Sequence, residues 1–309
     1  MRAAITGGTG FAGSHLAEAC ATAGDEVVTL ARGGDVAVDL LDAEATRRAV
    51  AEARPDVVYH LAAQAHVGRS WEDPLGTLTA NLAMSVNVLD AVRAEAPGAT
   101  VVAVASGEVY GPPARLPVDE RAELRPQNPY AVSKASADLL ARFYADAHGL
   151  RVIRPRPFNH AGPRQEPVYA IASFARQVAA GLEAGAGVPG NPIRIVTGNP
   201  DTRRDYTDVR DVVRAYRLLV EPGGGEAGEA YNVCSGRTAS AGELVRALAE
   251  QAGAEIDHVV DPKLVRAHEV MEIRGTYDKL HAATGWQPEI PLEVTLADTV
   301  AWWRGRLRT

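Results

Sequence analysis

Short apolar runs alternate with longer amphipathic stretches through the first half of the chain. The apolar runs predict strands at Ala3–Ile5, Glu26–Leu30, Asp56–His60, Thr100–Ala105 and Arg151–Ile153. The stretches between them predict helices at Phe11–Ala23, Ala43–Ala53, Leu75–Ala96 and Pro129–His148. Because the strand interiors are almost continuously apolar, the pattern indicates a parallel sheet covered by helices on both faces. We therefore predict an α/β fold with a doubly wound parallel sheet of the Rossmann type.

The pattern changes after about residue 158. Proline and glycine become dense at 155–167 and again at 181–200, and a final helix is expected at Leu292–Arg306. Gly223–Gly225 indicates a surface turn rather than a phosphate loop. We predict that residues 1–158, with roughly 208–233, form a dinucleotide-binding domain, and that 159–207 and 234–309 form a smaller α/β lobe for the substrate.

Composition narrows the class of protein. The chain has 309 residues and a net charge of −7, which argues against non-specific binding to nucleic acid. Cys20 and Cys234 are far apart and are expected to be reduced, packed thiols. The histidines show no metal-ligand spacing, so no metal site is predicted. Neither a signal peptide nor a membrane-length apolar stretch is recognised, so a cytoplasmic protein without a membrane partner is expected.

A glycine-rich motif follows the first predicted strand and opens the first predicted helix. It fits G-x-G-x-x-G from Gly8 and G-x-x-G-x-x-G from Gly7 equally well. The glycines permit a tight turn and close approach of a pyrophosphate to a helix N-terminus, where free N–H groups favour anions. We predict a dinucleotide site at Gly7, Gly10, Phe11, Ala12 and Gly13.

The residues after the second strand bear on which dinucleotide binds. A site specific for NAD would carry an acid near position 31, but Ala31 stands there and Arg32 follows it. Arg32 could bind a 2′-phosphate, so NADP(H) is favoured, and NAD(H) stays possible because no acid discriminates between the two. Asp39 is expected at the adenine edge. Further cofactor contacts are predicted at Leu40, Leu61, Ala62, Ala63 and Asn81.

Tyr130 and Lys134 lie four residues apart on a predicted helix, so their side chains share a face, about 6 Å apart along the axis. The ammonium is expected to lower the pKa of the phenol, which then donates or accepts a proton. The Ser106 hydroxyl could hold a substrate oxygen as charge develops on it. With the glycine motif, these residues indicate redox chemistry between a carbonyl and an alcohol.

Together these residues resemble the extended short-chain dehydrogenase/reductase superfamily over essentially the whole chain. The more specific part of the resemblance lies in the segments 156–165 (RPFNHAGPRQ), 204–211 (RDYTDVRD) and 231–236 (YNVCSG). The Phe-Asn-His form at 158–160 is similar to the branch that handles GDP-6-deoxyhexoses. The resemblance implies NAD(P)H-dependent reduction of the C4 ketone of GDP-4-dehydro-6-deoxy-D-mannose to GDP-D-rhamnose, with Tyr130 as proton donor.

The same resemblance implies roles for individual residues. Lys134 would hold the nicotinamide ribose, and Ser106 would bind the substrate carbonyl oxygen. Asn159 would contact the diphosphate, and Arg204 and Arg266 would bind the nucleotide phosphates. The remaining substrate-binding candidates are Glu269, for the ribose or base, and His160.

Some residues in these segments have structural interpretations instead. Arg203 is a weaker phosphate candidate than Arg204. Asp205 and Asp208 are expected to cap a helix that starts near Val209 rather than to act in catalysis. Residues 266–269 (RAHE) lack the proline of the superfamily's usual Arg-Pro-x-Glu, which leaves the backbone course there open.

Three other functions stay open. Ser106-Gly-Glu108 fits the Ser/Thr-x-Glu pattern of 4,6-dehydratases, in which Glu108 acts as acid or base; reductases of this branch also carry a glutamate there. An NDP-sugar C4 epimerase and a non-catalytic nucleotide sensor on the same scaffold are further alternatives. By resemblance, a homodimer is expected, formed through the helices at Leu75–Ala96 and Pro129–His148.

Overall fold

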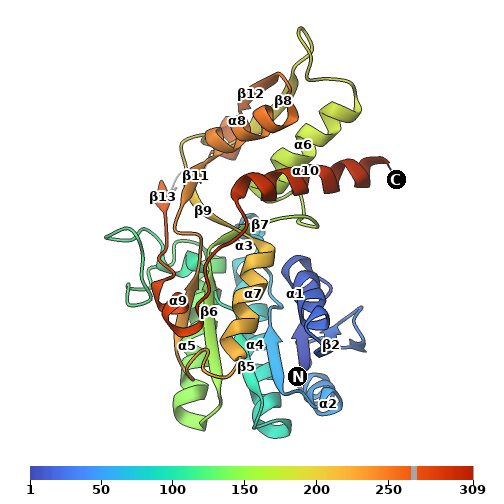
Figure 1. Ribbon diagram of the computed structural model, residues 1–309. Coiled ribbons are helices and arrows are strands. Elements are labelled where there is room, and N and C mark those ends of the chain that lie inside the picture. The colour runs from blue at the N-terminus through green and yellow to red at the C-terminus, as the bar shows by residue number, and fades with distance from the viewer. Residues whose placement is uncertain (266–269, 309) are drawn as a thin grey trace.

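The computed structural model describes residues 1–265 and 270–308, and its largest element is a seven-stranded sheet (Figure 1). The strands, in spatial order, are β10 (Ala230–Val233), β6 (Val152–Pro157), β5 (Thr100–Ala103), β4 (Val57–His60), β1 (Arg2–Thr6), β2 (Glu26–Ala31) and β3 (Val36–Ala37). Every neighbouring pair is parallel, which confirms the predicted doubly wound fold. The strand order reverses between β1 and β4, and ligands of such sheets bind at that point, beyond the carboxyl ends of the strands.

Helices cover both faces of this sheet. One face carries α1 (Phe11–Thr22) and α7 (Val209–Val220), and the other carries α2 (Ala43–Ala53), α4 (Pro74–Glu95) and α5 (Pro129–His148). The short α3 (Val67–Glu72) precedes α4. Helix α5 begins where the Asn128 side chain accepts a hydrogen bond from the Ala131 N–H at 2.7 Å, with Pro129 in the first turn. These local signals place the helices within a residue or so of their predicted bounds.

A second group of elements lies above the sheet in Figure 1. It comprises β7 (Asn159–Ala161), β8 (Ile193–Thr197), β9 (Arg203–Asp208), β11 (Thr238–Ser240), β12 (Ile256–Val260), β13 (Glu272–Ile273), α6 (Ala170–Glu183), α8 (Ala241–Ala252) and α10 (Leu292–Arg308). Its own core includes Phe174, Ile193, Leu244 and Leu296. The segment around α9 (Asp278–Thr284) does not belong to this core. Its Leu280 and Trp286 pack instead into the core of the seven-stranded sheet, beside α7. The domain boundaries as a whole stay a prediction.

Helix α4 corrects one expectation. It has 22 residues, and an 18-residue window within it has a mean hydropathy of 1.2, so by length and composition it could cross a membrane, whereas no membrane-length apolar stretch is expected from the sequence. Several of its side chains are buried, and it packs between α2 and α5. The core helix of a globular domain meets the same criteria.

Two smaller predictions are confirmed, and a tryptophan contact joins the last helix to the lobe. Cys20 and Cys234 are free and buried. Gly223 and Gly224 form a turn after α7. Trp303 packs α10 against α6, beside Ala175 and Ala179.

Candidate active site

The glycine motif forms the turn between β1 and α1. Gly7 has a φ of +69°, and the Gly10 N–H donates to the Gly7 carbonyl at 2.9 Å. A Cβ at Gly13 would lie 2.1 Å from the Gly7 carbonyl oxygen, so no residue with a side chain fits there. Within the described residues no side chain caps α1, which leaves its first N–H groups available to an anion. The geometry therefore favours the Gly7-Gly10-Gly13 spacing and suits a pyrophosphate.

The other predicted cofactor residues surround this turn. A Cβ at Gly7 would lie 3.0 Å from the Ala62 nitrogen, so the Leu61–Ala63 segment after β4 runs beside the glycine turn. Arg32 is exposed just beyond β2 and makes no ion pair or hydrogen bond with the described residues. The Asp39 carboxylate accepts from the Leu41 N–H at 3.1 Å, and Leu40 is buried. An exposed, unpaired guanidinium is the group that a 2′-phosphate requires, so these residues fit NADP(H).

Lys134 is buried near the carboxyl end of β5, where its Nζ donates to the Val104 carbonyl at 2.5 Å. Burial lowers the pKa of Lys134 to about 8. Burial raises the pKa of the Tyr130 phenol, and a hydrogen bond with Ser106 opposes that rise only in part. The pKa of Tyr130 therefore lies above its ordinary value and not below it as expected, because desolvation of the phenol outweighs the opposing hydrogen bond. A phenol held protonated at neutral pH is suited to donate a proton.

Ser106 and Glu108 approach Tyr130 from the segment after β5. The Ser106 Oγ accepts from the Glu108 N–H at 3.2 Å and so begins the short helical turn η1 (Gly107–Tyr110). The Glu108 carboxylate accepts from the Asn128 amide at 3.2 Å, immediately before α5. Both Ser106 and Glu108 influence the pKa of Tyr130. The fold thus gathers the four predicted catalytic residues at one place.

Asn159 and His160 lie on β7, which pairs with β9. The His160 ring stacks on Phe11 of the glycine motif, with ring centroids 5.8 Å apart and planes 6° apart. The His15 Nε2 lies 3.0 Å from the Pro163 carbonyl, which ties α1 to the same segment. The predicted substrate-binding segment therefore meets the predicted cofactor loop directly.

One residue near the phenol was not predicted. Tyr169 begins α6, contacts His66 with ring centroids 6.3 Å apart, and raises the pKa of Tyr130. It belongs to no recognised motif, so nothing in the local sequence distinguishes it.

The arginine candidates differ in their contacts. The Arg204 Nη1 donates to the carbonyls of Arg203 and Val270 at 2.9 and 2.8 Å. Arg203 is paired with Glu243 at 2.9 Å, which agrees with its lower ranking. Arg266 and Glu269 lie outside the described residues, so their predicted roles stay predictions.

The two aspartates of β9 have different structural roles. Asp208 caps α7 as predicted, accepting from the Arg210 N–H at 2.8 Å. Asp205 does not cap that helix; its carboxylate accepts from the backbone N–H groups of Ser235, Gly236 and Gly275 at 2.8, 3.0 and 3.2 Å. Burial raises the pKa of Asp205 to about 6. Asp205 therefore links β9 to the backbone at Ser235, Gly236 and Gly275 by hydrogen bonds.

The fold and this constellation define a nucleotide-dependent oxidoreductase scaffold, and the chain belongs to the NAD dependent epimerase/dehydratase family, whose model matches residues 3–234. The chain is 39% identical to GDP-6-deoxy-D-mannose reductase from Pseudomonas aeruginosa, over 100% of this chain and 99% of that one. It is 31% identical to UDP-glucose 4-epimerase from Mycolicibacterium smegmatis, over 99% of each. The solved structure of RMD from Pseudomonas aeruginosa complexed with NADPH matches with a TM-score of 0.88 and 38% identity, over 99% of this chain and 100% of that one.

Proposed function

We propose that this protein is an NADPH-dependent reductase that converts the C4 ketone of GDP-4-dehydro-6-deoxy-D-mannose to the alcohol of GDP-D-rhamnose. The observation that carries the proposal is the full-length similarity, at 39% identity, to GDP-6-deoxy-D-mannose reductase. The geometry supports it, because the Tyr130 phenol stays protonated and the glycine turn between β1 and α1 suits the pyrophosphate of a dinucleotide.

The residues divide the work of the reaction. NADPH, when bound, supplies the hydride that adds to C4. Tyr130 donates its proton to the alkoxide oxygen, and Ser106 hydrogen-bonds that oxygen as negative charge develops on it. Lys134 holds the nicotinamide ribose. NAD(H) can replace NADP(H) if the contact between Arg32 and the 2′-phosphate contributes little to cofactor binding. Asn81 and the Leu61–Ala63 segment line the cofactor side.

The substrate side is assigned by position in the chain. Asn159 and His160 on β7 bind the diphosphate region, and Arg204 on β9 binds a nucleotide phosphate. Arg266 and Glu269 complete the predicted set for the nucleotide. A cytoplasmic location accompanies this function as a prediction.

A 4,6-dehydratase is the second candidate, because Glu108 lies close enough to Tyr130 to influence the phenol's pKa and could act as an acid or base in elimination. The two functions differ in whether the cofactor is consumed. A reductase consumes one NADPH per sugar reduced, whereas a dehydratase recycles its bound cofactor.

With GDP-4-dehydro-6-deoxy-D-mannose as substrate, we expect the absorbance of NADPH at 340 nm to fall in proportion to the sugar converted. Product identity is checked by chromatography and NMR of the deoxyhexose. Turnover of GDP-mannose without net loss of NADPH would reject the reductase assignment and support the dehydratase.

Arg32 gives a test of cofactor choice. The Arg32→Glu variant should raise the dissociation constant for NADPH by about 10-fold or more, because charged hydrogen bonds to the 2′-phosphate are replaced by repulsion. NADH binding should change far less. The control is Arg194→Glu, which makes the same charge change at an exposed position of β8 in the lobe. Equal losses for NADPH and NADH would contradict a 2′-phosphate role.

Helices α4 and α5 expose an apolar surface that supports the predicted homodimer. Leu75 and Leu82 of α4 are 72% and 37% exposed, and Leu139 and Phe143 of α5 are 60% and 54% exposed. The two helices pack side by side, and the seven- and four-residue spacings place each pair on one helix face. A second copy of this chain would cover this surface in a four-helix arrangement.

Light scattering after size exclusion should therefore give a mass of two chains. The double variant Leu139→Glu with Phe143→Glu should give a monomer, because buried carboxylates would oppose association. Val188→Glu, at an exposed position of the loop between α6 and β8, is the control and should stay dimeric. A monomeric unmodified protein would reject this surface as a dimer interface.

A further inference from the structure

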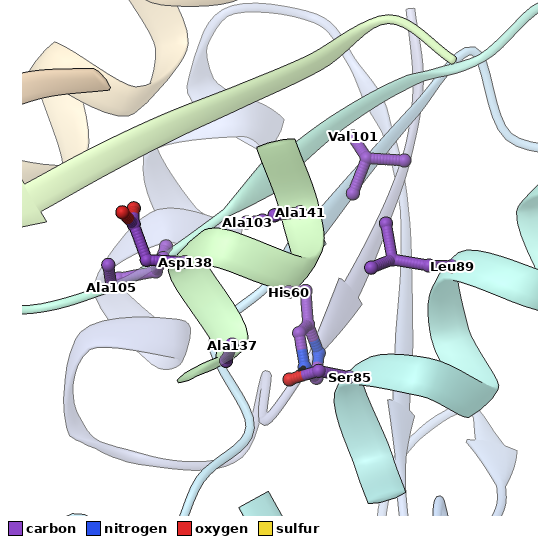
Figure 2. Close-up of a pocket in the computed structure, with 10 residues that line it drawn as sticks. His60, Ser85, Leu89, Val101, Ala103, Ala105, Ala137, Asp138 and Ala141 are labelled. Atoms are coloured by element: carbon purple, nitrogen blue, oxygen red, sulfur yellow. Dashed lines mark hydrogen bonds between the residues drawn. The ribbon is translucent and has the colours of Figure 1, made fainter. Parts of the chain in front are cut away.

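His60 ends β4 beneath the cofactor loop, and the proposed mechanism does not use it. Its imidazole is buried and lies against Ser85 of α4 (Figure 2). The two residues border a small cavity of about 10 Å³, lined mainly by apolar side chains, while the Asp138 carboxylate points away from them. Such a volume holds about one water molecule. His60 is therefore a buried, hydrogen-bonded histidine beside the catalytic helix α5.

Backbone partners of Thr6 and Ser85 favour one direction for the hydrogen bonds around His60. The Ala62 N–H donates to Thr6 Oγ1 at 3.2 Å, so the Thr6 hydroxyl proton is free to point to His60 Nδ1 at 2.9 Å. On the other side, Ser85 Oγ donates its one proton to the Asn81 carbonyl at 2.9 Å. With its proton directed to Asn81, Ser85 accepts from His60 Nε2, 3.3 Å away. This arrangement favours the His60 tautomer with its proton on Nε2.

The same logic continues from Asn81 to the catalytic helix. The Asn81 Oδ1 accepts from the Gln64 N–H at 2.7 Å, which orients the amide. Its Nδ2 donates to the Gln64 carbonyl at 3.2 Å and to Ser133 Oγ at 2.8 Å. Ser133 in turn donates to the Tyr130 carbonyl at 2.7 Å. The contacts therefore run without interruption from the cofactor loop to the backbone of Tyr130.

The ring's charge is compatible with this arrangement. Burial lowers the pKa of His60 to about 3, and the nearby Lys134 lowers it in the same direction. The imidazole is therefore neutral at neutral pH and adds no repulsion to the buried Lys134 ammonium. A cation at this position would require Thr6 to accept from both His60 and Ala62 and to turn its own hydroxyl proton away from the ring.

We propose that His60 is a positioning residue for proton transfer: as the neutral Nε2–H tautomer, it joins the cofactor loop to the Tyr130 helix through a one-directional chain of hydrogen bonds. The chain consists of Ala62, Thr6, His60, Ser85, Asn81, Ser133 and Tyr130. It fixes the distance between the bound nicotinamide and the Tyr130 phenol, and in this respect it rests on the proposed reductase function. Reactions of this kind are sensitive to shifts of about 1 Å between reacting groups.

The test breaks the chain at its two ends. Thr6→Val removes the hydroxyl with little change of shape, and Ser133→Ala removes the link to Tyr130. Each should lower kcat by about 10-fold and change the KM for the keto sugar by less than about 2-fold, because an unpaired buried polar group shifts its neighbours. The double variant should also lose about 10-fold in kcat, because the second substitution removes a link from a chain that the first has already interrupted.

The matched control is Thr46→Val, which removes an equally buried threonine hydroxyl bonded to the Asp42 carbonyl in α2, outside the chain. Its kcat should equal that of the unmodified protein, and thermal unfolding of each variant separates folding losses from kcat losses. If the double variant loses about 100-fold, or if Thr6→Val has the kcat of Thr46→Val, the chain does not act as a unit and the proposal is wrong.

Two readouts need no sugar substrate. Nitrogen-15 NMR of labelled histidine, with His60→Asn to assign the signal, should show a neutral Nε2–H ring at pH 7. Non-additivity of Thr6→Val and Ser133→Ala should also appear in the dissociation constant for NADPH. An imidazolium, an Nδ1–H ring or additive binding losses would overturn the proposal even if the substrate proved to be a different sugar. Absence of reductase activity in the unmodified protein, with these two results as expected, would reject only the proposed function.

Discussion

Tyr130→Phe is expected to lower kcat by about 10²- to 10⁴-fold, the range typical for loss of a positioned general acid. The phenol is the group that supplies the proton to the alkoxide, and burial keeps it protonated at neutral pH. Binding of NADPH, followed by fluorescence titration, should be nearly unchanged because the ring is retained. Single-turnover measurement of NADPH oxidation separates the chemical step from product release.

The matched control is Tyr144→Phe, because Tyr144 lies on the same helix α5 and its side chain is buried. It lies near the opposite end of the helix and should lose little activity. Retention of kcat in Tyr130→Phe would exclude the phenol as the proton donor and direct attention to Glu108.

Asp138→Asn is expected to destabilise the fold by about 3–5 kcal/mol, the cost of leaving a buried charge without its partner. The Asp138 carboxylate accepts from both Arg154 and Arg156, each at 2.7 Å, and all three side chains are at most 8% exposed. A neutral amide would leave two buried guanidinium groups without a counter-charge. Urea unfolding followed by circular dichroism measures the change.

Asp146→Asn is the control on the same helix. Asp146 pairs with Arg142 at 2.7 Å, but these two side chains are 57% and 42% exposed. Solvent screens such a pair, so the loss should stay below about 1 kcal/mol. Similar unfolding free energies for the two variants would show that the buried cluster contributes no more than a surface ion pair.

The local part of the fold could be predicted from the sequence. Asn128, Pro129 and Gly149 bound α5 through a cap, a pre-set φ and a left-handed terminus, all of which depend on neighbouring residues. Asp208 was placed correctly for the same reason. Asp205, three residues earlier, was not, because its partners are Ser235, Gly236 and Gly275, far along the chain.

The candidate site was predicted in its composition but not in its electrostatics. The spacing of Tyr130 and Lys134 suggested that the ammonium lowers the pKa of the phenol. In the structure desolvation raises the pKa of Tyr130 and lowers that of Lys134. Burial depends on everything that packs around a group, so a spacing of four residues could not determine it.

Local sequence patterns were sufficient to predict the parallel sheet, the glycine turn, the shared helix face of Tyr130 and Lys134, and the resemblance that points to a sugar nucleotide. These follow from periodicity and from steric demands over a few residues. The contact of His160 with Phe11, the raised pKa of the Tyr130 phenol and the hydrogen bonds around His60 depend on how distant segments pack. The links from Thr6 to His60 and from Asn81 to Ser133 join residues 54 and 52 positions apart. Such partners meet only when the strands and helices pack, because a hydrogen bond requires its two groups to lie within about 3 Å.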